Sequence, residues 1–161
     1  PMDAALGDRG SRARTVREVE RYLDVMQYGE YEIMQVIDRL AELGLVNDTA
    51  FAEEFVASRL RTKPVSRRHL REQLYAHELP REVIDEALST ITDEMERANA
   101  LEVAKKYAEQ FASLPREERE QRVTKRVLAR GFSYETVKNA MAELSLTASA
   151  EDGDAEETEI W

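Results

Sequence analysis

The residue types that most often carry catalysis form no recognisable constellation in this sequence. The two histidines, His69 and His77, are eight positions apart, whereas a metal pair on one helix needs a spacing of about four. The 161 residues include no cysteine, no HExxH, no glycine-rich phosphate loop and no GxSxG. Acidic pairs such as Glu53 and Glu54 are typical of exposed helix faces. We therefore expect no enzymatic activity, no metal and no cofactor.

Basic side chains are distributed more informatively. Residues 59–71, RLRTKPVSRRHLR, hold six Arg or Lys and no acid. Such a density of charge favours contact with phosphates or with an acidic protein surface, and the alternative is a solvated helix face. The binding residues predicted from this stretch are Arg59, Arg61, Lys63, Arg67, Arg68 and Arg71.

A second basic cluster lies in residues 116–130, where acids dilute it but three arginines fall on neighbouring turns of one predicted helix. A third lies in residues 9–21, where ion pairs to Glu18 and Glu20 are the simpler interpretation. No helix is marked as one that reads bases, so sequence-specific recognition has little support. The binding residues predicted from the second cluster are Arg119, Arg122, Lys125, Arg126 and Arg130.

The net charge of −10 is concentrated at the ends of the chain. Residues 148–161 carry six acids and no base, and residues 1–8 carry two acids and no base, which leaves 25 acids against 23 bases in between. The acidic C-terminal residues could fold over a basic strip and compete with phosphates, or they could simply increase solubility. Truncation after Thr147 with no change in affinity at low salt would favour the second interpretation.

The elements that must position these charges are predicted to be helices arranged as a repeat. Residues 121–144 are predicted to form a helix, a stop at Gly131 and a second helix with apolar residues three and four positions apart. Side chains that can accept amide hydrogen bonds are expected to cap helix starts, namely Thr15, Asp48, Thr92 or Asp93, and Ser133. The pattern occurs three times, with spacings of 51 and 53 residues between copies. Five apolar columns recur, and their members are Val19, Leu70 and Val123; Leu23, Leu74 and Val127; Tyr28, Leu79 and Phe132; Ile33, Ile84 and Val137; and Ile37, Leu88 and Met141.

The predicted fold class is therefore all-α, with tandem three-helix repeats that form an elongated, curved array. We expect poor order in residues 1–14, a first repeat over 15–46 with a short or missing leading helix, a second over 47–91 and a third over 92–146. Residues 147–161 are expected to be a disordered acidic tail, because they contain little apolar surface to offset the lost backbone entropy. The chain has neither a signal-peptide pattern nor an apolar run long enough to span a bilayer, so we expect a cytoplasmic protein without membrane contact.

Three segments resemble a known family. They are residues 12–19, RARTVREV; residues 36–61, which include Asp38-Arg39-Leu40, Gly44-Leu45 and Phe51-Ala52; and residues 128–141, LARGFSYETVKNAM. Together they are similar to the RecX family of bacterial RecA regulators, over roughly residues 11–146. The sequence departs from the family pattern in its Gly-containing first fourteen residues and in its low positive charge.

The resemblance implies a non-enzymatic regulator, expected to be a monomer, that binds the filament RecA forms on single-stranded DNA. It would limit filament extension and inhibit the ATPase, strand-exchange and coprotease activities. Two alternatives remain open from the residues alone: a helical-repeat protein that binds nucleic acid directly, and a scaffold that binds only proteins. A regulator that binds the RecA filament would bind free DNA weakly. A protein that binds nucleic acid directly would have a measurable affinity for DNA without RecA.

Overall fold

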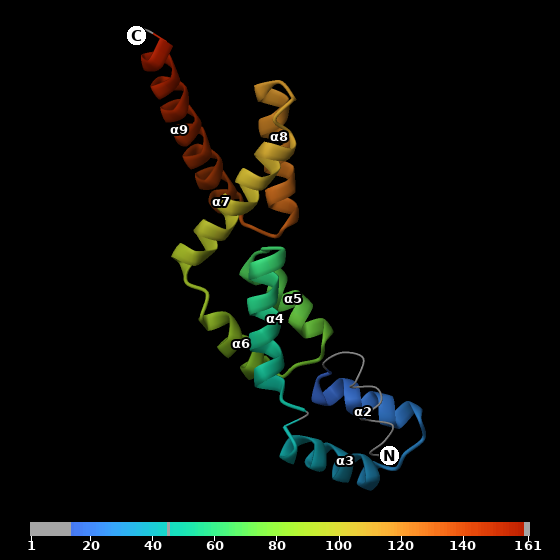
Figure 1. Ribbon diagram of the computed structural model, residues 1–161. Coiled ribbons are helices and arrows are strands. Elements are labelled where there is room, and N and C mark those ends of the chain that lie inside the picture. Colours follow the sequence, from blue (N-terminus) through green and yellow to red (C-terminus); the bar gives the residue numbers. More distant parts are fainter. Residues whose placement is uncertain (1–13, 45, 160–161) are drawn as a thin grey trace. The chain divides into compact units, whose positions relative to one another are not determined.

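The computed structural model describes residues 14–44 and 46–159, with side chains up to residue 148. Within these ranges there are eight α-helices and no strand. The all-α prediction is confirmed. The helices are α2 (Val16–Val25), α3 (Glu30–Glu42), α4 (Asp48–Thr62), α5 (Arg67–Ala76), α6 (Arg81–Ser89), α7 (Asp93–Gln110), α8 (Arg116–Ala129) and α9 (Tyr134–Glu159) (Figure 1).

The chain divides into two compact units. Unit 1 comprises residues 1–58 and 70–90, and unit 2 comprises residues 59–69 and 91–161. The helix pairs α2–α3, α5–α6 and α8–α9 correspond to the three predicted copies of the motif. The repeat boundaries at 46/47 and 91/92 remain predictions, as do the curvature of the array and the disorder of the segment before residue 15, of which residues 1–13 lie outside the described part.

Unit 1 is built on a small apolar core between α2 and α3, formed by Val19, Leu23, Val36, Leu40 and Val46. Thr15 caps α2, since its hydroxyl accepts a hydrogen bond from the Glu18 amide at 3.2 Å, as the sequence predicted.

The start of α4 differs from the expectation that Asp48 would cap it. Asn47 Oδ1 accepts the Ala50 amide at 3.0 Å, whereas Asp48 Oδ1 accepts the Val16 amide at 3.0 Å. Asp48 therefore satisfies the exposed end of α2, a partner that is distant in sequence.

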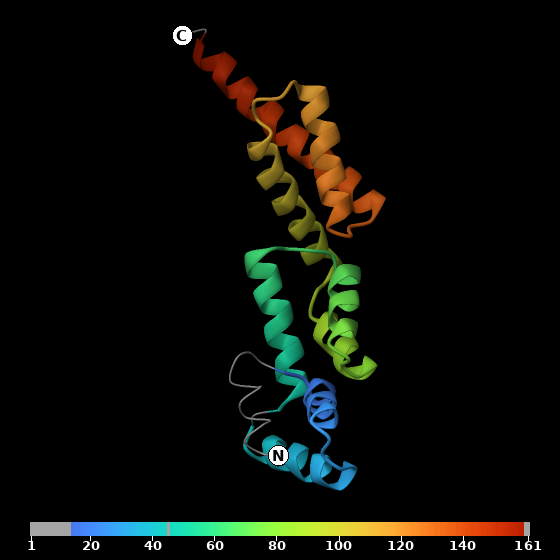
Figure 2. The same cartoon turned by 90° about the vertical axis from the view of Figure 1, so that its right-hand side faces the viewer.

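Unit 2 contains the three helices α7, α8 and α9, and α9 lies across α7 in both views of the ribbon (Figure 2). Thr92 and Ser133 cap α7 and α9 through hydrogen bonds from the Met95 and Thr136 amides, each 3.1 Å long. The core residues come from all three helices and from the turn between α8 and α9, and they are Ala100, Val103, Ala104, Val123, Val127, Phe132, Val137 and Ala140.

Gly131, at the end of α8, has φ +93°, the left-handed conformation in which a side chain is strained. A methyl group at this position would lie 2.6 Å from His69 Nδ1 and closer still to Ser66 Oγ. The Ser66 amide donates to the Arg130 carbonyl at 3.0 Å. Glycine is thus required both by the turn and by the approach of residues 66–69 to the end of α8.

The five apolar columns point inward, as predicted. Eleven of their fifteen members are buried, and the other four, Tyr28, Ile33, Ile37 and Met141, are half-buried against the two cores. Helix α9 is assigned to Glu159, past the predicted end of the third repeat at residue 146. The disorder of residues 147–161 in solution therefore stays a prediction. No helix of the described part is long and apolar enough to cross a membrane.

Candidate functional site

The first basic stretch, residues 59–71, spans the last turn of α4, a loop and the first turn of α5. Arg67 is directed to the start of α7, where Nη2 donates to Asp93 Oδ1 at 2.7 Å and Nε donates to Glu96 Oε2 at 2.8 Å. The hydrogen bond to Asp93 raises the pKa of Arg67 against the opposing effect of burial. Arg67 therefore stabilises unit 2 through ion pairs with Asp93 and Glu96 and is not a free cation.

The other members of this stretch have different surroundings. Arg71 forms an ion pair with Asp85 in unit 1, and that hydrogen bond raises the pKa of Arg71. Arg61, Lys63 and Arg68 are exposed, and no ion pair is found for them among the described residues. The predicted strip is thus divided between residues held by the chain's own carboxylates and residues that face solvent.

The second basic cluster lies on α8 and its C-cap, and it contacts two aromatic rings at the C-terminal end of α7. The rings of Tyr107 and Phe111 are stacked one helical turn apart, with centroids 6.2 Å from each other and an angle of 15° between their planes. The Arg126 guanidinium carbon lies 5.7 Å from the Tyr107 centroid and 6.0 Å from the Phe111 centroid, and the Arg122 carbon lies 5.9 Å from the Phe111 centroid. These are cation–π distances.

Arg130 joins this cluster to the first basic stretch. Its Nη1 donates to the Pro64 carbonyl and its Nη2 to the Tyr107 hydroxyl, both at 2.8 Å. The hydrogen bond from Arg130 lowers the pKa of Tyr107, and the positive charges of Arg126 and Lys63 lower it further. Several cations therefore act on a single hydroxyl, which indicates a locally positive surface.

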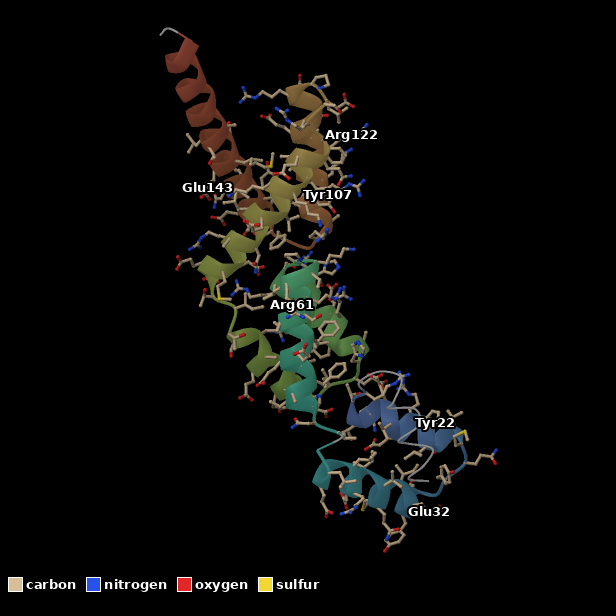
Figure 3. The ribbon with its side chains drawn as sticks, in the orientation of Figure 1. Tyr22, Glu32, Arg61, Tyr107, Arg122 and Glu143 are labelled. Carbon is tan, nitrogen blue, oxygen red and sulfur yellow. The ribbon has the colours of Figure 1, made fainter. Side chains whose placement is uncertain are left out.

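We call this surface the aromatic-arginine face and define it by Tyr107, Phe111, Arg122, Lys125, Arg126 and Arg130; Figure 3 labels Tyr107 and Arg122 on it. Four of these side chains, Phe111, Arg122, Lys125 and Arg126, line a shallow depression of about 280 Å³. Arg122 is also paired with Glu118 at 3.2 Å, whereas Lys125 and Arg126 have no ion pair within the described ranges.

The chemistry available to the face follows from these contacts. Guanidinium groups that lie on rings keep their edges free for hydrogen bonds, and planar edges suit the oxygens of a phosphate or carboxylate. Because the rings restrict the long Arg side chains, less rotamer entropy remains to be lost on binding. The half-buried rings add apolar surface against which a flat group can stack.

A larger depression of unit 2 shares no residue with this one. It has a volume of about 610 Å³, is lined by α7, α8 and α9, and includes Lys105, Glu109, Arg116 and Arg119. Arg119 Nη1 donates to the Ala112 carbonyl at 3.4 Å, and Arg116 pairs with Glu120 at 3.1 Å. Arg119 was predicted to act with Arg122 and Arg126, but it lines this separate depression.

The third basic cluster is largely paired where it is described. Arg14 contacts Glu18 at 3.3 Å, Arg17 contacts Glu20 at 3.1 Å, and Arg21 pairs with Glu78. Arg9 and Arg12 lie outside the described residues. The simpler interpretation of this cluster, ion pairs with neighbouring acids, is confirmed for Arg14 and Arg17.

The two histidines take part in packing. His77 Nδ1 lies 2.8 Å from Glu18 Oε1, and its ring packs 4.9 Å from Phe51 and 5.4 Å from Phe55 between centroids. His69 is half-buried, and its ring lies close to Gly131. The described residues contain no group of three or more His, Cys, Asp or Glu that could hold a metal ion.

Comparison with known proteins finds similarity to RecX. The model of the second three-helix domain of RecX matches residues 47–88. A solved structure, that of RecX from Lactobacillus salivarius, is 26% identical and superposes with a TM-score of 0.75 over 90% of this chain and 94% of that one. By these measures the chain is similar to RecX in sequence and in fold.

Two curated relatives of RecX extend the match. "Regulatory protein RecX" of Listeria welshimeri is 26% identical over 159 residues, which cover 99% of this chain and 58% of the relative. The protein of that name from Chlorobium phaeobacteroides is 36% identical over 88 residues, or 55% of this chain and 58% of the relative. The chain thus spans just under three-fifths of the length of the curated relatives it matches.

Tyr107 and Phe111 are functional candidates that sequence reasoning missed, because aromatic residues on a predicted helix are most simply explained by packing in its core. Their signal in the sequence is a pair of aromatics four residues apart, followed by Arg122 and Arg126, which are also four apart. Two helices with matched spacing can place rings against guanidinium groups, but only the packing of α7 on α8 brings these two helices together.

Proposed function

We propose that this chain is a RecX-family negative regulator of RecA that binds RecA filaments on single-stranded DNA through the aromatic-arginine face. The observation that carries the proposal is the set of cations gathered over Tyr107 and Phe111 in a chain similar to regulatory proteins. Binding would limit filament extension and inhibit ATPase, strand exchange and coprotease activity.

Complementarity of charge supports this proposal, and inhibition by binding requires no catalytic reaction. A nucleoprotein filament presents a dense array of phosphates, and a cationic face gains from the release of their counterions. Lys125 and Arg126 are exposed and form no ion pair within the described ranges, and Arg61, Lys63 and Arg68 are further exposed cations. Such a regulator acts by occupying a surface, so the proposal includes no catalysis and no cofactor, and it assumes a cytoplasmic monomer.

The test is the ATPase activity of RecA on single-stranded DNA, titrated with this protein below one molecule per RecA. We expect inhibition by the unmodified chain and at least tenfold weaker inhibition by the double variant Lys125→Glu, Arg126→Glu. Inhibition far below equimolar amounts would favour blocking of growing filament ends, whereas inhibition that rises in proportion to occupancy would favour binding along the filament.

The matched control changes the same amount of charge elsewhere on unit 2. Lys105 and Lys106 are exposed on α7 and do not line the depression of the aromatic-arginine face. The double variant Lys105→Glu, Lys106→Glu should inhibit as the unmodified chain does. Equal loss in both double variants would mean that only net charge matters, and no loss in either would refute the assignment of this face.

A second candidate function is direct binding of nucleic acid without RecA. The pairing of aromatic rings with arginines favours it, because this combination is common on surfaces that hold single strands. It predicts measurable affinity for an oligonucleotide alone, with a strong dependence on salt. A scaffold that binds only proteins would instead keep its partner after nuclease treatment and would not respond to changes at Lys125 and Arg126.

A further inference from the structure

The aromatic-arginine face has a feature that charge alone does not require. A surface that only attracts phosphates can consist of exposed lysines, yet here two guanidinium groups are placed within 6.0 Å of the centre of one ring, Phe111. The ring is half-buried and borders the shallow depression together with Lys125. A flat apolar surface and point charges are thus combined in one place.

We propose that Phe111 is a stacking site for one base of a single-stranded nucleic acid, with Arg126 and Lys125 binding the adjacent phosphates. The proposal deepens the proposed function, since it names the ligand of the same face, but its test needs no RecA. The geometry of the depression and the distribution of charge around it support the assignment.

The dimensions are compatible with a base at the ring. Two stacking contacts of about 3.5 Å each need about 7 Å between the ring and a guanidinium group. The guanidinium carbons of Arg122 and Arg126 are 5.9 and 6.0 Å from the ring centroid, and both side chains are exposed. A small outward rotation of these side chains would admit a base, and arginine can itself stack on the base from the other side.

The neighbouring ring explains why Phe111 rather than Tyr107 is the predicted platform. The Tyr107 hydroxyl is held by Arg130, and the guanidinium carbon of Arg130 lies 5.5 Å from the Tyr107 ring centroid. Tyr107 does not line the depression, whereas Phe111 does. Tyr107 thus fixes the position of Phe111 through the stacked contact, and Phe111 presents its ring to the ligand.

The charges point to a strand of nucleic acid rather than to a free acidic side chain. Lys125 and Arg126 follow one another on α8 and are both exposed without an internal ion pair in the described part of the chain. Among the described residues, the acid found in an ion pair with a residue of the depression is Glu118, which pairs with Arg122. A ligand with phosphates beside a flat ring uses both parts of this site, whereas a carboxylate uses only the cations.

The experiment compares two labelled probes by fluorescence anisotropy with the full chain. One is an oligothymidylate of about 15 nucleotides, and the other is an abasic strand of the same length and charge. The unmodified chain should bind the oligothymidylate roughly tenfold more tightly, because stacking contributes about 1 to 3 kcal/mol per base. Phe111→Leu should weaken binding of the oligothymidylate by a similar factor and leave the abasic strand unaffected.

Two further variants make the result specific. Tyr134→Leu removes an aromatic that is 73% exposed on α9 and for which no contact with an arginine is found within the described residues, so it should change neither affinity. Arg122→Lys keeps the charge but removes the planar group that can stack on the base, so it should weaken binding of the oligothymidylate more than binding of the abasic strand. Helicity and thermal unfolding of each variant verify that it is folded.

Equal losses on both probes for Phe111→Leu would overturn the proposal, because the ring would then act only through packing. An unchanged affinity for both would overturn it as well. If Phe111→Leu weakens inhibition of RecA but not oligothymidylate binding, the depression faces protein, and the stacking site fails while the proposed function survives. If the unmodified chain binds the oligothymidylate through Phe111 but does not inhibit RecA, the proposed function fails while the stacking site survives.

Discussion

Residues 59–71 and residues 116–130 are two basic regions that each hold six Arg or Lys, but their arginines have different surroundings. In the first, Arg67 and Arg71 are engaged by Asp93, Glu96 and Asp85 of the same chain. In the second, arginines lie over aromatic rings. The difference teaches that density of positive charge in a sequence does not say which cations are available to a partner. A carboxylate satisfies an arginine, whereas a ring supports it and leaves its hydrogen-bonding edge open.

The largest expected effect on stability comes from disrupting the contact between the two regions at Gly131, where Ser66 and His69 approach the end of α8. Gly131→Ala should lower the free energy of unfolding by about 3 kcal/mol, since it combines a left-handed backbone with overlap against Ser66 and His69. Gly44→Ala is the matched control, because Gly44 has φ +70° but nothing within 4 Å of the added carbon, so it should cost only about 1 kcal/mol. Urea unfolding measures both, and equal losses would contradict the close approach.

The next effect tests whether Arg67 is structural. Arg67→Gln should cost about 2 kcal/mol of unfolding free energy, because it removes charge-assisted hydrogen bonds to Asp93 and Glu96. Arg68→Gln, at an exposed neighbour, should stay within about 0.5 kcal/mol. Thermal unfolding of the pair is the measurement. A larger loss of unfolding free energy for Arg68→Gln than for Arg67→Gln would contradict the assignment of Arg67 as structural and Arg68 as solvent-facing.

A smaller effect concerns the third basic cluster and depends on pH. Burial by itself raises the pKa of Glu18, but its hydrogen bonds with His77, Arg14 and Thr15 outweigh burial and lower the pKa below its ordinary value of 4.5. Because the folded pKa is depressed, the stability from ionised Glu18 is present above that ordinary value and is lost as pH falls through the folded pKa.

Glu18→Gln should therefore cost about 1 kcal/mol near neutral pH, and the gap between variant and unmodified chain should narrow in acid. Glu20→Gln, whose partner Arg17 is 67% exposed, should cost less than about 0.5 kcal/mol at either pH. Unfolding curves recorded across the acid range provide the comparison. A gap that stays constant with pH would show that ionisation of Glu18 is unimportant.

The smallest effect on stability should accompany a clear effect on binding. Arg126→Gln removes cation–π contacts at an exposed site and should cost about 0.5 kcal/mol. If Arg126 contacts a phosphate, the slope of log affinity against log salt for a single strand should fall by about 0.7. Arg67→Gln should leave that slope unchanged. Arg67 would then affect mainly the free energy of unfolding, and Arg126 mainly the affinity for nucleic acid.

Much of the local structure could be predicted from sequence. The caps Thr15, Thr92 and Ser133 and the inward columns follow from patterns within a few residues, which helical geometry makes readable. The exchange of roles between Asn47 and Asp48 at the start of α4 could not be predicted, because the Val16 amide that Asp48 satisfies is 32 residues away.

The sequence by itself determined the helices, their repeat and the presence of two dense basic regions. Only the tertiary structure decided which arginines are engaged and which rings support the others. Arg67 finds its acids 26 and 29 residues away, and Arg130 finds Tyr107 at 23 and Pro64 at 66. Helical periodicity determines which residues are neighbours three and four positions apart. The distant partners of a long, flexible arginine depend on which groups tertiary packing brings within its reach.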